Sequence, residues 1–197
     1  DKECHTKTPY LAEELNKSKE QYKYIVDIAQ PYLNIIAMAV PIQNFLIDMC
    51  ADDGIIFYRI GRAPDLESAG YKPGCTAASG IFRNNALADC IDTGRPATAC
   101  SNEHIFKDWS CYAAPVIDIN EKVKCAIGIT VPKNESNDKL LYLAMLAAAG
   151  ISEALKGLNE ESRLNYDNEL LLKFAEGILK IASMLSHEIR NSLSTIS

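Results

Sequence analysis

Two pairs of apolar runs, each joined by a short polar turn, constrain the fold more than any other feature of the chain. The first pair covers 44–50 and 55–60 and surrounds the turn Ala51-Asp-Asp-Gly54. The second pair covers 109–117 and 123–131, with a short polar linker between them. Strands joined by turns this short pair in antiparallel orientation. The chain is therefore predicted to be an α+β protein, with an antiparallel sheet and helices on one face.

Segments before and between the two hairpins have the periodicity of helices. Over Tyr10–Val40, apolar residues recur near intervals of three and four, which predicts helix. Pro31 is expected to open a second helix there, because proline suits a first helical turn and not an interior. Residues 61–80 are rich in Gly, Pro, Ser and Ala and are predicted to form a loop or short irregular strands. Residues 81–92 are predicted to form a short helix that stops at Thr93-Gly94.

The C-terminal part of the chain contains no proline from Asp138 onward. About 60 residues of mostly helical spacing predict a coiled coil or a signalling rod. Its last part carries an apolar seam that is close to a heptad repeat with one slip: Leu171, Phe174, Ile178, Ile181, Leu185, Ile189, Leu193 and Ile196. We expect a compact domain over 1–137, a helical linker over 138–175 and the start of a further helix over 176–197, so that the chain is a fragment.

Composition argues against several classes of protein. The chain has 20 basic and 26 acidic residues, and this net charge of -6 argues against a nucleic-acid-binding module. No apolar run reaches the ~18 residues of a membrane span, and no signal peptide is visible. The seven cysteines include no CxxC pair and make a disulfide framework improbable. We expect a cytoplasmic protein with free thiols.

The string Ser186-His-Glu-Ile-Arg-Asn-Ser-Leu193 is the most specific motif. On a helix, His187 lies off the apolar seam, so its imidazole is free to attack the γ-phosphate of ATP. Glu188 is placed to accept the departing proton, and Asn191, one turn on, to orient a water that later removes the phosphoryl group. The simpler alternative is a surface histidine on a charged helix face.

This string resembles the H-box of sensor histidine kinases, with Ser192 standing where that family usually has proline. The resemblance implies that 176–197 begins a dimerisation and phosphotransfer helix. It also implies a homodimer and a response regulator as partners, with His187 as phospho-acceptor. ATP would bind in a kinase domain that the chain lacks, so we expect no kinase activity from the chain alone.

A second resemblance covers about residues 20–131. It rests on the order of several short motifs: Ala51-Asp-Asp-Gly54, Asn84-Asn-Ala-Leu87, Thr93-Gly-Arg-Pro96, Glu103-His104, Trp109-Ser-Cys-Tyr-Ala-Ala-Pro115 and Cys125-Ala-Ile-Gly128. Together they resemble GAF domains of enhancer-binding activators of the acetoin-responsive type. The resemblance implies a GAF fold, with a sheet of about six strands, helices on one face and a small-molecule pocket on the other. It leaves the ligand open.

The pocket implied by this resemblance is walled by residues 74–100 and by the strand at Trp109. Four cysteines fall in that region: Cys75, Cys90, Cys100 and Cys111. They are candidates for an iron–sulfur or zinc site, for a haem ligand alongside His104, or for a thiol redox switch. The alternative is that they are small core residues, as expected for Cys50 and Cys125. Trp109 and Tyr112 either line a pocket for an organic ligand or pack within the sheet.

Three functions are compatible with these features. The first is the input part of a cytoplasmic sensor histidine kinase, which detects a small molecule, a gas or a redox signal and relays it to His187. The second is a redox or metallocofactor-binding module. The third is the ligand-sensing part of a transcription activator, against which the Ser186–Leu193 string and the negative charge argue. The sequence does not identify the signal.

Overall fold

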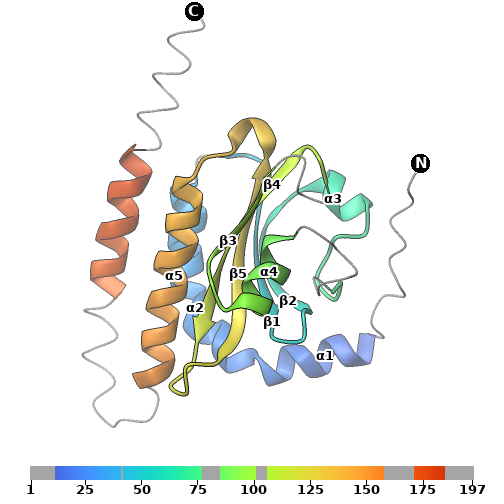
Figure 1. Ribbon diagram of the computed structural model, residues 1–197, viewed down its shortest axis with the longest axis vertical. Coiled ribbons are helices and arrows are strands. Elements are labelled where there is room, and N and C mark those ends of the chain that lie inside the picture. Colours follow the sequence, from blue (N-terminus) through green and yellow to red (C-terminus); the bar gives the residue numbers. More distant parts are fainter. Residues whose placement is uncertain (1–11, 41, 77–84, 101–105, 158–170, 185–197) are drawn as a thin grey trace, which may run out of the picture.

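The computed structural model describes residues 12–40, 42–76, 85–100, 106–157 and 171–184, and an antiparallel sheet with strand order β2-β1-β5-β4-β3 lies at its centre (Figure 1). The strands are β1 (Phe45–Ala51), β2 (Ile56–Arg62), β3 (Ala97–Cys100), β4 (Trp109–Ile117) and β5 (Val123–Pro132). The helices are α1 (Ala12–Gln21), α2 (Lys23–Ala39), α3 (Pro64–Ser68), α4 (Ala86–Thr93) and α5 (Lys139–Lys156), with a short 3₁₀ turn at Lys133–Glu135. A further helix covers 171–184.

The α+β class and both predicted hairpins are confirmed, since β1 pairs with β2 and β4 with β5 in antiparallel register. This arrangement is consistent with a GAF-like fold. The described sheet has five strands, where about six were expected. The predicted loop over 61–80 contains the short helix α3, which begins at Pro64. None of the described helices combines the length and the apolar character that a membrane crossing requires.

Both faces of the sheet are buried, and helices cover both, not one. In the β4–β5 register, Ala114 lies opposite Ile127 and Ala113 lies opposite Gly128. Because successive side chains of a strand alternate between faces, these two pairs point to opposite sides. The face with Ala114 and Ile127 is covered by α2 and α5 and is called the α5 face, and the 171–184 helix lies on the outer side of α5 (Figure 1). The face with Ala113 is covered by α3 and α4 and is called the α4 face.

A contact between two helices organises the core of the α5 face. The ring of Tyr32 on α2 packs directly over Gly150 on α5, because a Cβ atom added at Gly150 would lie 2.5 Å from the Tyr32 ring. Phe174 of the 171–184 helix meets the other side of this contact, with its ring 4.7 Å from that of Tyr32 in edge-on orientation. The 171–184 helix therefore packs against α2 and α5 on the side that faces away from the sheet (Figure 1).

The break between the first two helices lies at Tyr22, so the expectation that Pro31 opens the second helix is wrong. α2 runs through Pro31. Tyr22 is fixed between the helices because its ring stacks on Phe57 at 4.6 Å and its hydroxyl donates a 2.8 Å hydrogen bond to Asp52. Pro31 lies on the exposed side of α2, where water can bond the backbone carbonyl that a proline leaves without a helical partner.

The expectation of one continuous rod after Asp138 is also wrong. α5 ends at Lys156, and Gly177 of the 171–184 helix lies beside Leu146 of α5, within 3.2 Å of an added Cβ atom. In a straight helix residues 146 and 177 would be about 46 Å apart, at ~1.5 Å of rise per residue. The chain therefore returns along α5 (Figure 1). The boundaries expected at 137 and 175 stay predictions.

The contact at Gly150 predicts an unusual response to alanine. In an ordinary helix interior, a change from glycine to alanine stabilises by about 1 kcal/mol. At Gly150 the added methyl group must displace the buried Tyr32 ring, so Gly150→Ala should lower the free energy of unfolding by about 2 kcal/mol. Urea denaturation followed by circular dichroism measures this change.

Gly157→Ala is the matched control, because an added Cβ atom at Gly157 meets nothing within 4 Å and its backbone is helical. This variant should be as stable as the parent or slightly more stable. Equal effects of the two substitutions would show that packing of Tyr32 against α5 does not govern the response.

Candidate functional site: the α4 face of the sheet

The α4 face gathers most of the pocket residues predicted from the sequence. Cys90, Cys111 and Trp109 are buried in one cluster there, with Cys75 packed against its edge. Cys50, expected to be a simple core residue, belongs to the same cluster. The remaining buried members are mostly small or aliphatic: Leu46, Ile56, Ala63, Leu66, Tyr71, Ala86, Leu87, Ala99, Ala113 and Ala126.

Two predicted pocket residues lie on the other face. The β3–β4 register places Ala99 opposite Cys111, so the next residue, Cys100, points to the α5 face. Tyr112 also points there, and its hydroxyl shares a 2.6 Å hydrogen bond with Ser136 and lies 3.9 Å from the Cys100 sulfur. His104 lies outside the described residues.

A single site formed by all four predicted cysteines is therefore contradicted, because the sheet separates Cys100 from Cys111. In the segments that the structure describes, no three His, Cys, Asp or Glu side chains converge as metal ligands would. The H-box residues His187, Glu188 and Asn191 lie outside those segments, so their expected roles stay predictions.

The buried thiols of the α4 face are held in the protonated form. Burial raises the pKa of Cys90 to about 12, and the neighbouring Cys111 adds to the rise. Burial likewise raises the pKa of Cys111 to about 12 and that of Cys50 well above its ordinary value. The thiolate is the reactive and metal-binding form of cysteine, so these three side chains behave as small apolar groups at neutral pH.

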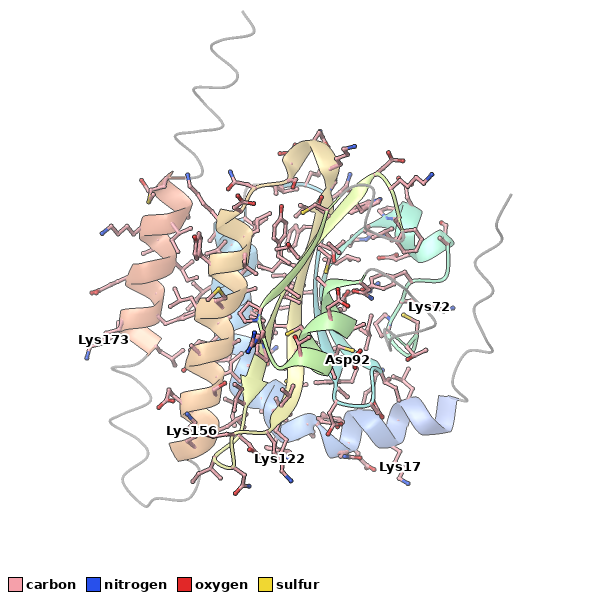
Figure 2. The ribbon with its side chains drawn as sticks, in the orientation of Figure 1. Lys17, Lys72, Asp92, Lys122, Lys156 and Lys173 are labelled. Carbon is pink, nitrogen blue, oxygen red and sulfur yellow. The ribbon has the colours of Figure 1, made fainter. Side chains whose placement is uncertain are left out.

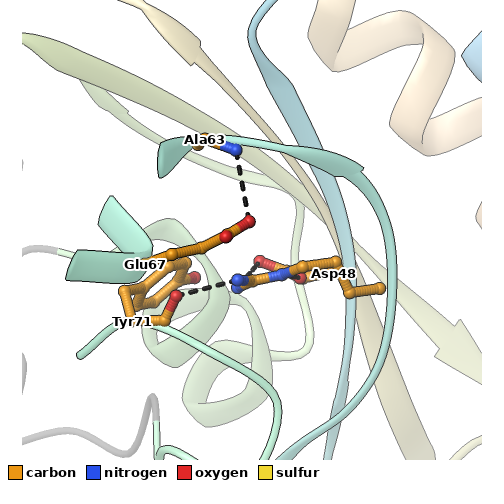
Figure 3. A network of polar contacts seen from close by, with 5 residues as sticks. Asp48, Ala63, Glu67 and Tyr71 are labelled. Carbon is orange, nitrogen blue, oxygen red and sulfur yellow. Dashed lines mark hydrogen bonds and ion pairs between the residues drawn. The ribbon is translucent and has the colours of Figure 1, made fainter. Parts of the chain in front are cut away.

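A buried ion pair that sequence reasoning missed lies on the β1–β2 side of the α4 face. Asp48 of β1 is opposite Arg59 of β2. The guanidinium meets the carboxylate through two hydrogen bonds, from Nε at 2.6 Å and from Nη2 at 3.0 Å, and Nη1 donates to the main-chain oxygen of Tyr71 at 2.8 Å (Figure 3). The Asp48 side chain is fully buried and that of Arg59 is 7% exposed.

This network fixes the protonation and orientation of both groups. Burial raises the pKa of the Asp48 carboxyl, while the guanidinium and the Tyr71 hydroxyl favour its charged form. The guanidinium also lies over the Tyr71 ring, 5.0 Å from its centroid, in a cation–π contact. Tyr71 in turn meets the ring of Phe106 edge-on at 5.9 Å, so the pair is enclosed by aromatic side chains.

The helix α4 closes the face next to this ion pair. Asn85 starts the helix by accepting a hydrogen bond from the Leu87 amide, and Gly94 ends it in the left-handed conformation. Leu87 packs so close to β5 that a Cβ atom at Gly128 would lie 2.9 Å from its side chain. Gly128 is also the residue opposite Asp48, so only glycine leaves room there for both α4 and the carboxylate.

Two polar groups on the α4 face can form more hydrogen bonds than the contacts described above use. Arg59 has five N–H donors, of which the contacts to Asp48 and Tyr71 use three. The buried hydroxyl of Thr130, diagonal to Asp48 in the β1–β5 register, has no oxygen or nitrogen partner among the described residues and only the weakly polar Cys111 thiol beside it. Such groups, set among small side chains, can hold a small ligand that carries an oxygen acceptor or a hydroxyl.

The sequence contained a signal for the ion pair. Asp48 and Arg59 each interrupt an apolar run, and they are equally far from the Asp-Gly turn that joins the two runs. Two opposite charges at facing positions of a predicted hairpin indicate a cross-strand pair.

The raised thiol pKa values predict slow alkylation. With iodoacetamide at pH 8, Cys50, Cys90 and Cys111 should remain unmodified in the folded protein, whereas the half-buried Cys75 and Cys100 should react first. Peptide mapping by mass spectrometry identifies the modified residues. Modification of Cys90 or Cys111 at the rate seen in denaturant would contradict their burial as neutral thiols.

The same shifts predict how stability changes in alkaline solution. Below about pH 8.5 both the folded and the unfolded chain keep these thiol protons. Above that pH the unfolded chain releases them, while the folded chain keeps the Cys111 proton up to about pH 12, so stability falls as pH rises. Cys111→Ala should reduce this slope in urea denaturation between pH 9 and pH 10 by up to about 1.4 kcal/mol per pH unit.

Comparisons with known proteins agree with this architecture. No family model matches the chain. The chain is 21% identical over 169 residues to the acetoin dehydrogenase operon transcriptional activator AcoR of Bacillus subtilis (strain 168), covering 83% of this chain and 27% of AcoR. It is 21% identical over 146 residues to the propane 2-monooxygenase operon transcriptional activator MimR of Mycolicibacterium smegmatis (strain ATCC 700084 / mc(2)155), covering 70% of this chain and 25% of MimR. The chain thus spans about a quarter of the length of these relatives.

Among solved structures, the chain is similar to a chain of the E. coli DhaR(N)-DhaL complex, with a TM-score of 0.68 and 19% identity. The match covers 81% of this chain and 56% of that chain. At this identity the similarity shows the fold alone. The chain therefore shares its fold with a structure from a two-protein complex and part of its sequence with transcriptional activators.

Proposed function

We propose that this chain contains the sensory input domain of a cytoplasmic regulator, and that a small oxygen-bearing molecule binds on the α4 face. The Asp48–Arg59 pair carries this proposal, because it is a fully buried, oriented polar group within an otherwise apolar cluster. The two curated relatives, both transcriptional activators, support a regulatory role.

The side chains of the α4 face restrict the kinds of ligand that could bind there. Its side chains next to the sheet are small, such as Ala99, Ala113 and Ala126, which favours a compact ligand with apolar groups. Arg59 already neutralises Asp48, so its spare N–H donors suit an uncharged carbonyl or hydroxyl better than a second carboxylate. AcoR is named for an acetoin dehydrogenase operon, and acetoin is a small uncharged molecule with a carbonyl and a hydroxyl group; MimR is named for a propane 2-monooxygenase operon, and propane is small but carries no oxygen.

Methyl NMR tests this proposal, and methyl groups on the opposite face of the same sheet serve as the control. Acetoin, acetone and glycerol are the probes. A ligand on the α4 face should shift the methyl signals of Ala113 and Ala126, while Ala114 and Ile127, their neighbours on the α5 face, should not respond. We expect saturation by at least one probe with a dissociation constant below about 1 mM.

Arg59→Lys tests the polar anchor. Lysine keeps the positive charge beside Asp48 but lacks the planar fork that also holds the Tyr71 carbonyl, so the probe should bind at least tenfold more weakly. Equal shifts on both faces of the sheet, or an Arg59→Lys variant with unchanged affinity, would contradict the proposed site.

A second proposed function concerns the output of the domain. The motif Ser186–Leu193 is the specific observation that favours a histidine kinase, with His187 as phospho-acceptor, Glu188 as proton acceptor and Asn191 as the residue that orients water. In that case the chain forms a homodimer and passes its phosphoryl group to a response regulator. The curated relatives support the alternative output, a transcription activator, and give no support to a kinase.

Phosphorylation distinguishes these outputs. When the chain is fused to the ATP-binding domain of a histidine kinase and supplied with ATP, it should acquire an acid-labile phosphate. His187→Gln should abolish this labelling, and Glu188→Gln should slow it by about 100-fold or more, the usual contribution of a general base. Labelling that persists in His187→Gln would reject the phospho-acceptor, and absence of labelling in the parent fusion would reject the kinase output.

A further inference from the structure

A small group of polar side chains lies on the α5 face, close to the start of α5. The hydroxyl of Tyr112 on β4 shares a 2.6 Å hydrogen bond with that of Ser136, which lies shortly before α5. The same Tyr112 hydroxyl is 3.9 Å from the sulfur of Cys100, the last residue of β3. Because Tyr112 is fully buried, Cys100 is half-buried and Ser136 is exposed, the group extends from the core to the surface.

Ser110 belongs to the same group and has a hydroxyl that no contact uses. It lies opposite Cys100 in the β3–β4 register, and it points to the α5 face because its neighbours Trp109 and Cys111 point to the α4 face. Directly opposite residues of antiparallel strands have Cβ atoms about 4.5–5.5 Å apart. Ser110 is fully buried, and its hydroxyl has no hydrogen-bond partner in the part of the chain that the structure describes. Such a hydroxyl costs stability, so a role for it beside the thiol would explain its presence.

The described cysteines offer Cys100 no partner for a disulfide. Cys125 is on the same face, but it lies near the start of β5, whereas Cys100 is beside the end of β5, about 20 Å away at ~3.3 Å of rise per residue. Figure 2 shows Lys122, the residue before β5, at the same end of the molecule as Lys156, the last residue of α5. Cys111 is closer in the sheet, but its side chain points to the other face, which prevents a disulfide unless the backbone moves.

We propose that Cys100 is a site of reversible oxidation, where a hydroperoxide converts the thiol to a sulfenic acid that Ser110 and Tyr112 hold by hydrogen bonds. The sulfur attacks one peroxide oxygen and the O–O bond breaks, so sulfur is oxidised by two electrons and the peroxide is reduced. The thiol proton ends on the departing oxygen, and the overall change is Cys–SH + ROOH → Cys–SOH + ROH. With hydrogen peroxide the second product is water.

The surroundings of Cys100 suit the oxidised sulfur better than the thiol. A separation of 3.9 Å from the Tyr112 hydroxyl is long for a hydrogen bond, and an oxygen added to the sulfur shortens this gap. The added hydroxyl can also bond Ser110, which then gains the partner that it lacks. A sulfenic acid normally condenses with a second thiol. Since no described cysteine can supply one, we expect the acid to persist until an external dithiol reduces it, releasing water and forming its own disulfide.

Trapping with dimedone tests this proposal on the purified chain. Dimedone labels sulfenic acids, and peptide mapping by mass spectrometry locates the label after brief exposure to hydrogen peroxide. Cys100 should carry at least about fivefold more label than Cys75, which is also half-buried but lies at the α4 face. Dithiothreitol added before dimedone should remove the label. Ligand binding at the α4 face has no part in this experiment, so either proposal can fail without the other.

Ser110→Ala separates stabilisation of the sulfenic acid from access to the thiol. The label on Cys100 should fall about fivefold, the effect of one lost hydrogen bond, while alkylation of Cys100 by iodoacetamide in the reduced protein should stay within about twofold of the parent rate. The reduced variant should also unfold about 2–4 °C higher, because a buried hydroxyl without a partner has been removed. Tyr112→Phe keeps the buried ring and should lower the label on Cys100 as well.

Three results on the label would overturn the proposal: no label on Cys100, equal label on Cys75 and Cys100, or unchanged label in both variants. A lower unfolding temperature for reduced Ser110→Ala would also overturn it, because the Ser110 hydroxyl would then already be in use before oxidation.

Discussion

The buried pair of Asp48 and Arg59 is the interaction on which the α4 side of the molecule depends. It joins β1 to β2 through two hydrogen bonds and extends through the Tyr71 carbonyl and ring to the segment that follows α3. Withdrawing two charges from water is expensive, and such a pair is often no more stabilising than apolar side chains of the same size. Its presence is therefore better explained by what it positions than by what it adds to stability. It orients a guanidinium within an otherwise apolar cluster.

The two faces of the sheet differ in the size of the side chains they present and in the helices that cover them. On the α5 face, large side chains such as Ile127 and Ile129 pack against long helices, and the close contact of Tyr32 with Gly150 locks α2 to α5. On the α4 face, the strands present alanine, cysteine and glycine to two short helices. The α4 face is therefore closed by short helices, whereas long helices cover the other face.

Much of this architecture could be predicted because it is encoded locally. The Asp-Gly turn at 53–54 specifies the first hairpin, and Gly94 specifies the end of α4, whereas its start at Asn85 lies later than the predicted residue 81. The expectations that the structure contradicts all depend on how distant segments of the chain are arranged in space. Whether Cys100 and Cys111 share a face depends on the β3–β4 register, and the spacing of 11 residues between them in the sequence does not determine that register. The effect of Pro31 could not be predicted from the sequence, because it depends on which side of α2 meets solvent. The return of the chain along α5 depends on Tyr32 and Phe174, which are far apart in the sequence.

The 171–184 helix is coupled to the core of the domain through Phe174. Phe174 touches Tyr32 in the core, and Leu172 is on the same rigid helix only two residues away. Any displacement of α2 or α5 that rotates Phe174 must therefore rotate Leu172 and Leu179 by the same angle, since a helix turns as a unit over this distance.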